Sequence, residues 1–372
     1  MNGASTWTPA AILPNISVRE AIEGEVIALT PRADTRVQTF CAAYPKFAAL
    51  LSRFTDAFRV PLDPAIVMVR DDVLSELSHV EPLASFRDLL ALSVIPYCRS
   101  MSVVYQNIGR ISYSNSFWLY PWMLGKDNEH LVATTPAMTA LHVVEEFHGQ
   151  SSPELPQMQL SELDAPLFDA LLRRWKRHYL GKRQRWLDRA LFRSLNMAMQ
   201  AAQLPAGIDT TLYDLGRTAA LWVSAFEILA HPRTASSGLH SVYPLFERVT
   251  YRDRNVGRRR YCAYMGRSKR PSARRPLPCW LYGRLYQARC KFLHGSPVQA
   301  SLLHPKNAKA SLFWLASSLY RLALTGFLDL AFKRRAPGLN ESERLGEHIA
   351  ADMKFYKFQE IAERALLRGR RT

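Results

Sequence analysis

Residues 212–230 read LYDLGRTAALWVSAFEILA, and this stretch decides the fold. Its apolar side chains recur in alternating steps of three and four, which draws one narrow stripe along a helix. The residues of the stripe are Leu212, Leu215, Ala219, Trp222, Phe226 and Leu229. His231 and Pro232 follow directly, and a proline there predicts the end of the helix. The stretch therefore predicts one long helix that buries a single face.

Three more stretches have the same periodicity. Residues 186–202, 280–294 and 312–331 each carry apolar residues at helical spacing along one side. Gly295 and Pro297 follow the second of them, as expected for a glycine cap and a helix breaker. Four such helices with no strands between them predict a helical bundle.

The last of these stretches is apolar enough to raise the question of a membrane span. Arg321 and Asp329 fall inside residues 312–332, and a charge in the middle of a bilayer is costly. We therefore expect a buried bundle helix and no membrane span.

The first part of the chain has a mixed pattern. Residues 25–29 and 65–69 are short apolar runs typical of strands, and residues 86–94 have helical spacing. Residues 111–120 are aromatic and rich in serine, which predicts a strand pair. A polar stretch with two prolines, residues 149–156, has the composition of a domain boundary.

The sequence thus predicts a mainly α protein of two domains, which also suits its 372 residues. Residues 1–152 would form a mixed α+β domain of unknown function. Residues 157–372 would form a four-helix bundle with an arginine-rich insert at about 232–279.

The formal net charge is +17, and much of it is clustered inside this insert. Asp253 is the single acid among residues 252–275, and three tyrosines (Tyr251, Tyr261 and Tyr264) are interleaved there. Arginine binds phosphates and stacks on bases, and tyrosine offers a ring for stacking. The predicted nucleic-acid-binding residues are Arg252, Arg254, Arg258, Arg259, Arg260, Arg267, Lys269, Arg270, Arg274 and Arg275.

Two further basic groups, residues 173–185 and 368–371, favour a binding surface for a polyanion over a merely solvated loop. The alternative is a peripheral membrane protein whose basic patches bind anionic lipid. No basic helix with a clean apolar face on its opposite side supports that alternative. Nucleic acid is therefore the predicted partner.

The cysteines indicate the compartment. The five of them fit no CxxC framework, which predicts a reducing environment; they are Cys41, Cys98, Cys262, Cys279 and Cys290. A zinc site drawn from the last three and His294 would need long, irregular intervals. The N-terminus lacks the basic start and apolar run of a signal peptide. We expect a cytoplasmic protein that needs no metal and no cofactor.

One small cluster in the N-terminal part could bind a metal ion. His142 and Glu146 would share a helix face, with Glu145 and His148 beside them. No second pair with ligand spacing accompanies them, so a helix end at the surface is the default interpretation.

Arg289 and His294 are the residues that could perform chemistry. Arg289 lies on the same side of its helix as Leu285 and Tyr282, so it leans toward the bundle interior and needs a partner. Glu227, at the edge of the stripe in the preceding helix, is the natural candidate. His294 stands in the last turn, where we expect the glycine cap to swing it back toward the arginine.

Such a pair has the parts needed for RNA cleavage without a metal. An arginine can hold a phosphate and stabilise its developing charge, and a histidine can move protons near neutral pH. The alternative is a structural arginine and histidine near a helix end.

Residues 221–229 (LWVSAFEIL), a variable insert and residues 285–295 (LYQARCKFLHG) together resemble the HEPN superfamily, and are similar above all to its ApeA-like bacterial domains. The resemblance covers roughly residues 185–335. It implies a metal-independent RNA endonuclease in which Arg289 and His294, separated by four residues, are the catalytic pair. It also implies a homodimer and a toxin-like role in bacterial defence.

Three residues are predicted to support that pair: Glu227, Tyr282 and Cys290. Glu227 resembles the acidic residue often found in the preceding helix of the family. The position after the arginine is often Asn, Asp or His in active members, and it is Cys290 here. The alternative is therefore a non-catalytic HEPN module that binds RNA or a protein partner. The N-terminal domain would sense a phage trigger or a regulatory partner.

Overall fold

The computed structural model describes the chain with gaps. The described residues are 6–56, 58–107, 111–119, 123–124, 131–135, 138–141, 156–203, 211–233, 238–266, 273–304, 309–330 and 342–369. The chain forms two compact units, each built from several segments. Unit 1 comprises residues 1–88, 113–161 and 174–184, and unit 2 comprises residues 89–112, 162–173 and 185–372. These units are defined by contacts within the folded chain. The predicted division at residues 152–157 is between domains that fold independently, and it stays a prediction.

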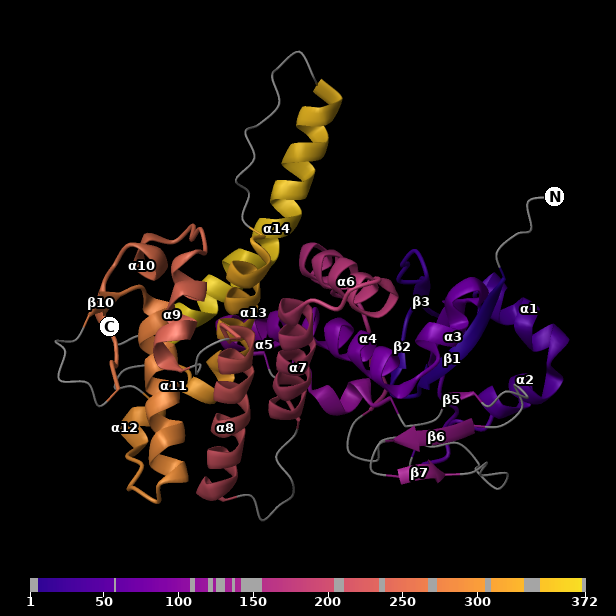
Figure 1. Cartoon of the computed structure of the whole chain (residues 1–372), viewed down its shortest axis with the longest axis horizontal. Helices are drawn as coiled ribbons and strands as arrows, with labels where there is room; N and C mark the ends of the chain where they lie inside the picture. Colours follow the sequence, from indigo (N-terminus) through magenta and orange to yellow (C-terminus); the bar gives the residue numbers. More distant parts are fainter. Residues whose placement is uncertain are drawn as a thin grey trace. The chain divides into compact units, whose positions relative to one another are not determined.

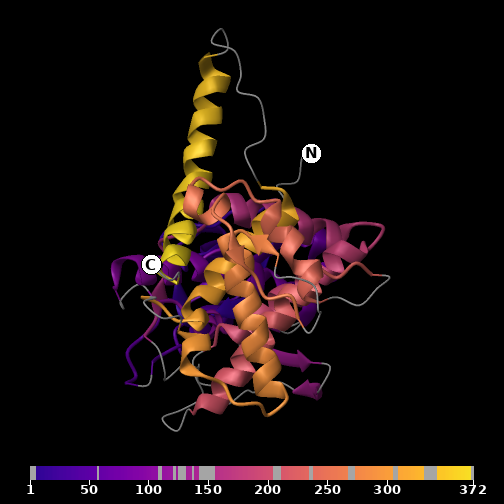
Figure 2. The same cartoon turned by 90° about the vertical axis from the view of Figure 1, so that its left-hand side faces the viewer.

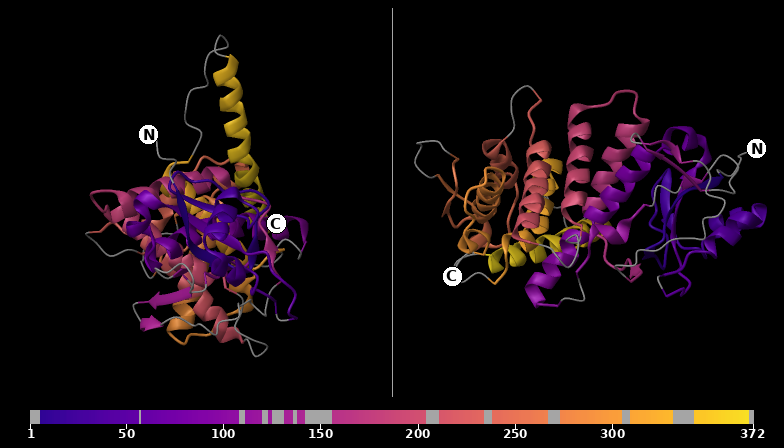
Figure 3. Two further views of the ribbon diagram at one scale, coloured as in Figure 1. Left: turned by 90° about the vertical axis from the view of Figure 1, so that its right-hand side faces the viewer. Right: turned by 90° about the horizontal axis from the view of Figure 1, so that it is seen from below.

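Unit 1 contains a three-stranded antiparallel sheet, drawn in indigo in Figures 1 and 3. Its strands lie in the order β1 (Trp7–Leu13), β4 (Ala65–Arg70) and β3 (Ile27–Thr30). The strands predicted at residues 25–29 and 65–69 are thus confirmed as β3 and β4. The sequence analysis does not predict strand β1, which contains Pro9. The register shifts between Pro9 and Ala11, and β1 lies at the sheet edge, where a proline is tolerated.

Two helices pack against this sheet. They are α1 (Thr35–Ala43) and α2 (Pro45–Leu51). Asp34 caps the first of them by accepting a hydrogen bond from the backbone N–H of Arg36 at 2.9 Å. The shared core is apolar and closely packed; its residues are Ile12, Val37, Phe40, Phe47, Leu50, Leu51, Phe54, Ile66 and Met68.

The remaining elements of unit 1 are short. They are η1 (Asp71–Val73), α3 (Leu74–Leu77), the parallel pair β2 (Ile16–Ser17) and β8 (Met158–Gln159), η3 (Ser114–Phe117), and the antiparallel strands β5 (Met123–Leu124), β6 (Leu131–Thr135) and β7 (Met138–Leu141).

The strand pair predicted at residues 111–120 is wrong for the described residues 111–119. Residues 114–117 instead form the 3-10 helix η3. The N–H of Ser116 donates to the carbonyl of Tyr113 at 3.2 Å, and the N–H of Trp118 donates to that of Asn115 at 3.2 Å. All four residues of η3 are buried, whereas a strand with one solvated face would alternate.

Two helices cross the division between the units. They are α4 (Val80–Leu92), which confirms the helix expected around residues 86–94, and α6 (Ala165–Leu180). Within unit 1, Trp175 of α6 is fully buried, and its indole Nε1 donates to the carbonyl of Pro82 at 2.9 Å. Lys176 forms an ion pair with Glu25. Part of the basic group at residues 173–185 therefore stabilises the fold.

Unit 2 contains the four predicted bundle helices, with ends within three residues of the expected ones. They are α7 (Trp186–Ala201), α8 (Leu212–Leu229), α11 (Leu277–Leu293) and α13 (Leu312–Leu328). Neighbouring helices in this order pack against one another, as Figures 1 and 2 show for α8 and α11. The mainly α prediction is confirmed.

The unit is larger than a four-helix bundle. Among the further helices of the unit are α5 (Ile95–Tyr105), α9 (Leu239–Glu247) and α14 (Ser342–Arg368). Helix α9 lies inside the predicted arginine-rich insert, where the sequence analysis predicts no helix, and five of its residues are buried. At Gly326 of α13 a Cβ would lie 1.9 Å from the carbonyl oxygen of Leu245, so glycine permits the close approach of α13 to α9.

An aromatic cluster fills the middle of unit 2. Phe226 of α8 lies with its ring centroid 4.9 Å from that of Tyr282, 5.9 Å from that of Phe246 and 5.4 Å from that of Tyr320. Trp222, one turn before Phe226, is fully buried. The predicted stripe of α8 is thus the side of the helix that faces the core.

Arg321 lies in the middle of α13 and is buried with its partners. Its Nε donates to Asp164 at 2.9 Å, and its Nη1 donates to the side-chain oxygen of Gln359. Gln359 in turn donates to Glu363 at 2.8 Å. A buried cation with a carboxylate and an amide acceptor suits a helix inside a protein. Among the described residues, no helix is long and apolar enough to span a bilayer.

Candidate catalytic site and nucleic-acid interface

Helix α11 ends in the glycine cap that the sequence predicts. Gly295 has φ +65°, the left-handed conformation that favours glycine. Its N–H donates to the carbonyl of Phe292 at 3.3 Å, and the N–H of Ser296 donates to that of Lys291 at 2.8 Å. These two hydrogen bonds satisfy the last carbonyl groups of the helix, so the end of α11 is well defined.

This end of α11 is held against α8. At Gly216 of α8 a Cβ would lie 2.9 Å from the Phe292 ring, so the two helices touch there. Phe226 and Tyr282 meet at the opposite ends of the same two helices, which makes α8 and α11 antiparallel. Phe292 also packs on the cluster formed by Ala288, Leu302 and Leu303.

Arg289 is half-buried near this end. Its guanidinium carbon lies 5.9 Å from the centroid of the Tyr286 ring, and its Nε has no hydrogen-bond partner in the described part of the chain. Burial raises the pKa of Glu227, and the charge of Arg289 opposes that rise. The two charges are thus close enough to interact, but no ion pair joins them within the described residues.

Tyr282 is part of the core. It is fully buried among Phe226, Tyr243 and Phe246, its hydroxyl has no described hydrogen-bond partner, and burial raises its pKa well above the usual value. A supporting role through direct contact with a substrate would require the core to open.

Tyr286 is a site residue that the sequence analysis did not include. It lies one turn before Arg289 and is only half-buried. Burial raises the pKa of its phenol, and the nearby Cys290 and Glu227 add to that rise. Helical spacing of three from Arg289 could have identified it.

His294 is exposed at the C-cap of α11. Its backbone N–H donates to the carbonyl of Cys290 at 3.1 Å, so the backbone still follows the helix at this residue. The chain turns only at Gly295. Five residues correspond to about 140° around a helix axis, so the cap does not bring the histidine to the arginine's side. Leu293 beside it is 56% exposed.

The arginine-rich insert has a folded base. It contains α9, the short helix α10 (Arg254–Gly257) and the hairpin of β9 (Tyr261–Cys262) with β10 (Arg274–Arg275). The backbone N–H groups of Arg252 and Asp253 donate to the buried Glu363 at 3.2 and 2.8 Å. Tyr251, expected to stack on bases, instead donates to the carbonyl of Phe246 at 2.8 Å.

Two of the predicted binding arginines are engaged within the fold. The Arg252 guanidinium lies 4.5 Å from the centroid of the Tyr356 ring and 3.8 Å from the Glu360 carboxylate. The Arg275 guanidinium lies 4.8 Å from the Tyr243 ring centroid and forms an ion pair with Glu247.

Five other predicted arginines are exposed, and none has an acidic partner among the described residues. They are Arg254, Arg258, Arg259, Arg260 and Arg274. The remaining predicted residues, Arg267, Lys269 and Arg270, lie outside the described part of the chain.

A stack of two aromatic rings between two arginines joins the hairpin to α11. Arg259 lies 5.7 Å from the Tyr261 ring centroid, that ring lies 5.9 Å from Trp280, and Arg284 lies 5.1 Å from the Trp280 ring centroid. The Arg284 Nη2 also donates to the carbonyl of Leu302 at 3.0 Å. The stack fixes the position of the hairpin on α11 and leaves the neighbouring arginines in solvent.

Neither of the two metal sites considered in the sequence analysis is seen in the described residues. Cys279 is buried and donates to the carbonyl of Tyr243, while Cys262 is exposed on β9. No group of three or more histidine, cysteine or acidic residues that could hold a metal ion occurs in the described ranges. His142 and Glu146 lie outside them.

Comparison of the chain with family models, with curated proteins and with solved structures found no match. The resemblance to the HEPN superfamily stays a prediction from residues 185–335.

Proposed function

We propose that this protein is a metal-independent RNA endonuclease of HEPN type, with Arg289 holding the scissile phosphate and His294 moving a proton. The observation that carries the proposal is the state of Arg289, which is a half-buried cation with an unpartnered Nε and no ion pair within the described residues. Burying a charge without a partner is costly, and a phosphate would supply one.

The reaction would use the RNA's own nucleophile. The ribose 2′-hydroxyl attacks the adjacent phosphorus, the bond from phosphorus to the 5′-oxygen breaks, and a 2′,3′-cyclic phosphate and a 5′-hydroxyl result. His294 takes up the proton of the 2′-hydroxyl or donates one to the departing 5′-oxygen. Arg289 stabilises the negative charge that develops on the phosphate oxygens.

A second copy of the chain would complete the site. Arg289 and His294 lie about 140° apart around α11, so one protomer does not direct both at one phosphate. In a symmetric homodimer, the arginine of one protomer and the histidine of the other could act on the same phosphate. The exposed Leu293 beside His294 offers apolar surface for such an interface.

RNA would reach this site along the insert. The five exposed arginines lie on or beside α10 and the hairpin, and the stack from Arg259 to Arg284 connects that surface to α11. Arginines without acidic partners are free to bind phosphates. The biological setting, a toxin-like effector in bacterial defence, rests on the family resemblance.

The second candidate is a non-catalytic module that binds RNA or a protein partner. It is favoured by Cys290, which follows Arg289 at the position where active members of the HEPN superfamily often have a more polar side chain. In this case the exposed arginines would bind RNA and no strand would be cut.

Induction of the chain in a bacterial host separates the two candidates. The ribonuclease should stunt growth and degrade cellular RNA, and a His294→Ala variant expressed at the same level should do neither. Normal growth with intact RNA under both forms, or equal toxicity of both, would overturn the proposed catalytic role.

A further inference from the structure

Unit 1 contains a cleft between the start of β1 and helix α1. Its volume is about 450 Å³, within the range of small-molecule sites. The cleft combines hydroxyl groups, charged groups and rings; it is lined by Thr6, Trp7, Thr8, Thr35, Arg36, Thr39, Phe40, Ala43, Tyr44 and Asp71. It belongs entirely to unit 1 and so is separate from the Arg289 site.

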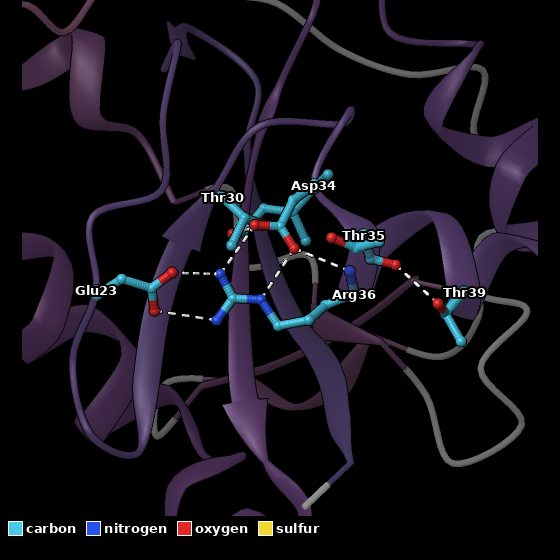
Figure 4. A network of polar contacts seen from close by, with 7 residues as sticks. Glu23, Thr30, Asp34, Thr35, Arg36 and Thr39 are labelled. Atoms are coloured by element: carbon cyan, nitrogen blue, oxygen red, sulfur yellow. Dashed lines mark hydrogen bonds and ion pairs between the residues drawn. The ribbon is translucent and has the colours of Figure 1, made fainter. Parts of the chain in front are cut away.

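The single cation in this lining is already neutralised, as Figure 4 shows. Arg36 donates through Nε and Nη2 to Asp34, each at 2.9 Å. It donates through Nη1 and Nη2 to Glu23 at 3.0 and 2.6 Å. These two carboxylates raise the pKa of Arg36, and its guanidinium covers the Trp7 ring at 5.0 Å from the centroid. An anionic ligand would have to displace them.

The carboxylate of Asp71, unlike the guanidinium of Arg36, has no partner of opposite charge among the described residues. It accepts the hydroxyls of Thr6 and Thr8, the latter at 2.8 Å. Two hydroxyl donors orient the carboxylate without neutralising it. The charge of Asp71 is thus available to a ligand in the cleft.

Aromatic rings supply the rest of the wall. Tyr44 is 39% exposed, and its ring stacks on Phe40 with the centroids 4.5 Å apart. The faces of such rings attract cations. A carboxylate and an exposed tyrosine ring that line the same cleft suit the binding of an organic cation.

The segment that contains the cleft also differs in net charge from the whole chain. Residues 1–88 contain eleven acidic and eight basic residues, a net charge of −3, whereas the chain carries +17. Excess negative charge favours the approach of cations.

We propose that this cleft binds an organic cation, an ammonium or guanidinium group on an apolar body. The cationic group would pair with Asp71, and the body would lie against Tyr44 and Phe40. The ligand could be a free amine or a basic side chain of a peptide, because both present the same chemistry.

Calorimetric titration of the full-length protein, freed of nucleic acid, tests this proposal. The probes are benzylamine, which is protonated at neutral pH, as a free amine, tri-arginine as a peptide, and phenyl phosphate as a matched anion. At least one cation should bind saturably, and the anion should not. The cation that binds more tightly shows whether the ligand is a free amine or a basic side chain of a peptide. Asp71→Asn should weaken cation binding about tenfold, because the charge-assisted contact is lost.

Asp72→Asn provides the matched control. Asp72 neighbours Asp71 but pairs with Arg70 and does not line the cleft. Its substitution should change cation affinity less than about twofold. Saturable binding of neither cation, preference for phenyl phosphate, or equal losses in the two variants would overturn the proposal.

Discussion

The guanidinium carbon of Arg289 lies 5.9 Å from the centroid of the Tyr286 ring, and the Arg289 Nε has no hydrogen-bond partner in the described part of the chain. The fold therefore holds a half-buried cation with one unsatisfied donor, and only the nearby charge of Glu227 opposes it within the described residues. Such a position costs stability, which a fold tolerates where the charge binds a ligand.

Replacing Arg289 with methionine should separate function from stability. The substitution keeps an unbranched apolar stem and removes a charge that has no ion pair, so the free energy of unfolding should change by less than about 1 kcal/mol. RNA cleavage should fall by about 10²- to 10³-fold, because one group that stabilises the phosphate is lost. Urea unfolding and a cleavage assay measure the two effects.

Arg284→Met on the same helix is the matched control. Arg284 donates to the carbonyls of Ser301 and Leu302, so its loss should cost about 1–3 kcal/mol. Because Arg284 also covers the Trp280 ring beside the hairpin, its loss should change RNA affinity and leave the cleavage rate at saturating RNA unchanged. A loss of about 3–5 kcal/mol in Arg289→Met would instead mean that Arg289 is a structural partner of Glu227.

The exposed arginines should dominate RNA affinity. Substituting Arg254, Arg258 and Arg260 with alanine should weaken binding and flatten the dependence of log K on log salt by about 0.7 for each phosphate contact removed. Fluorescence anisotropy over a range of salt concentrations measures both.

Arg275→Ala serves as the comparison for these three, since Arg275 pairs with Glu247 and covers the Tyr243 ring. Its main effect should be on thermal stability. An unchanged salt slope in the triple variant would show that RNA does not bind this surface.

Glu363 should make stability depend on pH. Burial raises the pKa of this carboxyl above its ordinary value of 4.5, so the folded state holds the proton more tightly than the unfolded chain does. Its contribution to stability is therefore fully present below pH 4.5 and is lost as the pH rises through the folded-state pKa.

A Glu363→Gln variant cannot ionise at this position. The difference in unfolding free energy between Glu363→Gln and the parent should shift in favour of the variant as the pH rises from 4.5 toward neutrality. Urea unfolding at several pH values measures it. A difference that stays constant with pH would show that the carboxyl is not perturbed in the folded state.

The contact between α13 and α9 should be intolerant of a methyl group. A Cβ at Gly326 would lie 1.9 Å from the carbonyl oxygen of Leu245, so Gly326→Ala forces the helices apart and should destabilise unit 2 by about 1–3 kcal/mol. Gly346 of α14 has open space around it, so Gly346→Ala should stabilise the helix by about 0.5–1 kcal/mol. Equal effects of the two substitutions on the unfolding temperature would contradict this packing.

The bundle helices were predictable because each has a strong local signal. The stripe of α8 contains Trp222 and Phe226, which proved to be fully buried, and Gly295 ends α11 as its residue type implies. Periodicity and caps depend only on neighbouring residues, so they can be read without the tertiary structure.

Other features depend on contacts distant in sequence. Strand β1 contains Pro9, which argues against a strand until its place at the sheet edge is known. Residues 114–117 form a 3-10 helix that is buried on all sides. Tyr251 and Arg275 have the composition of a binding surface, yet Phe246 and Glu247 of the core helix α9 engage them.

The residues of the candidate site could be predicted from the sequence, but their arrangement in space could not. Spacing identified Arg289, Glu227 and His294, but the missing ion pair of Arg289 depends on how α8 and α11 cross. The exposure of His294 depends on the chain turning at Gly295, one residue later.

Cleavage of an RNA oligonucleotide by the purified protein in EDTA tests the central claim most directly, with His294→Ala and His304→Ala compared in parallel. His304 is an exposed histidine at the C-cap of α12 (Ala300–Leu303) and should be dispensable. The account predicts that the parent and His304→Ala cut the RNA, leaving 2′,3′-cyclic phosphate ends, and that His294→Ala does not. Intact RNA with the parent, or equal cleavage by His294→Ala, would contradict it.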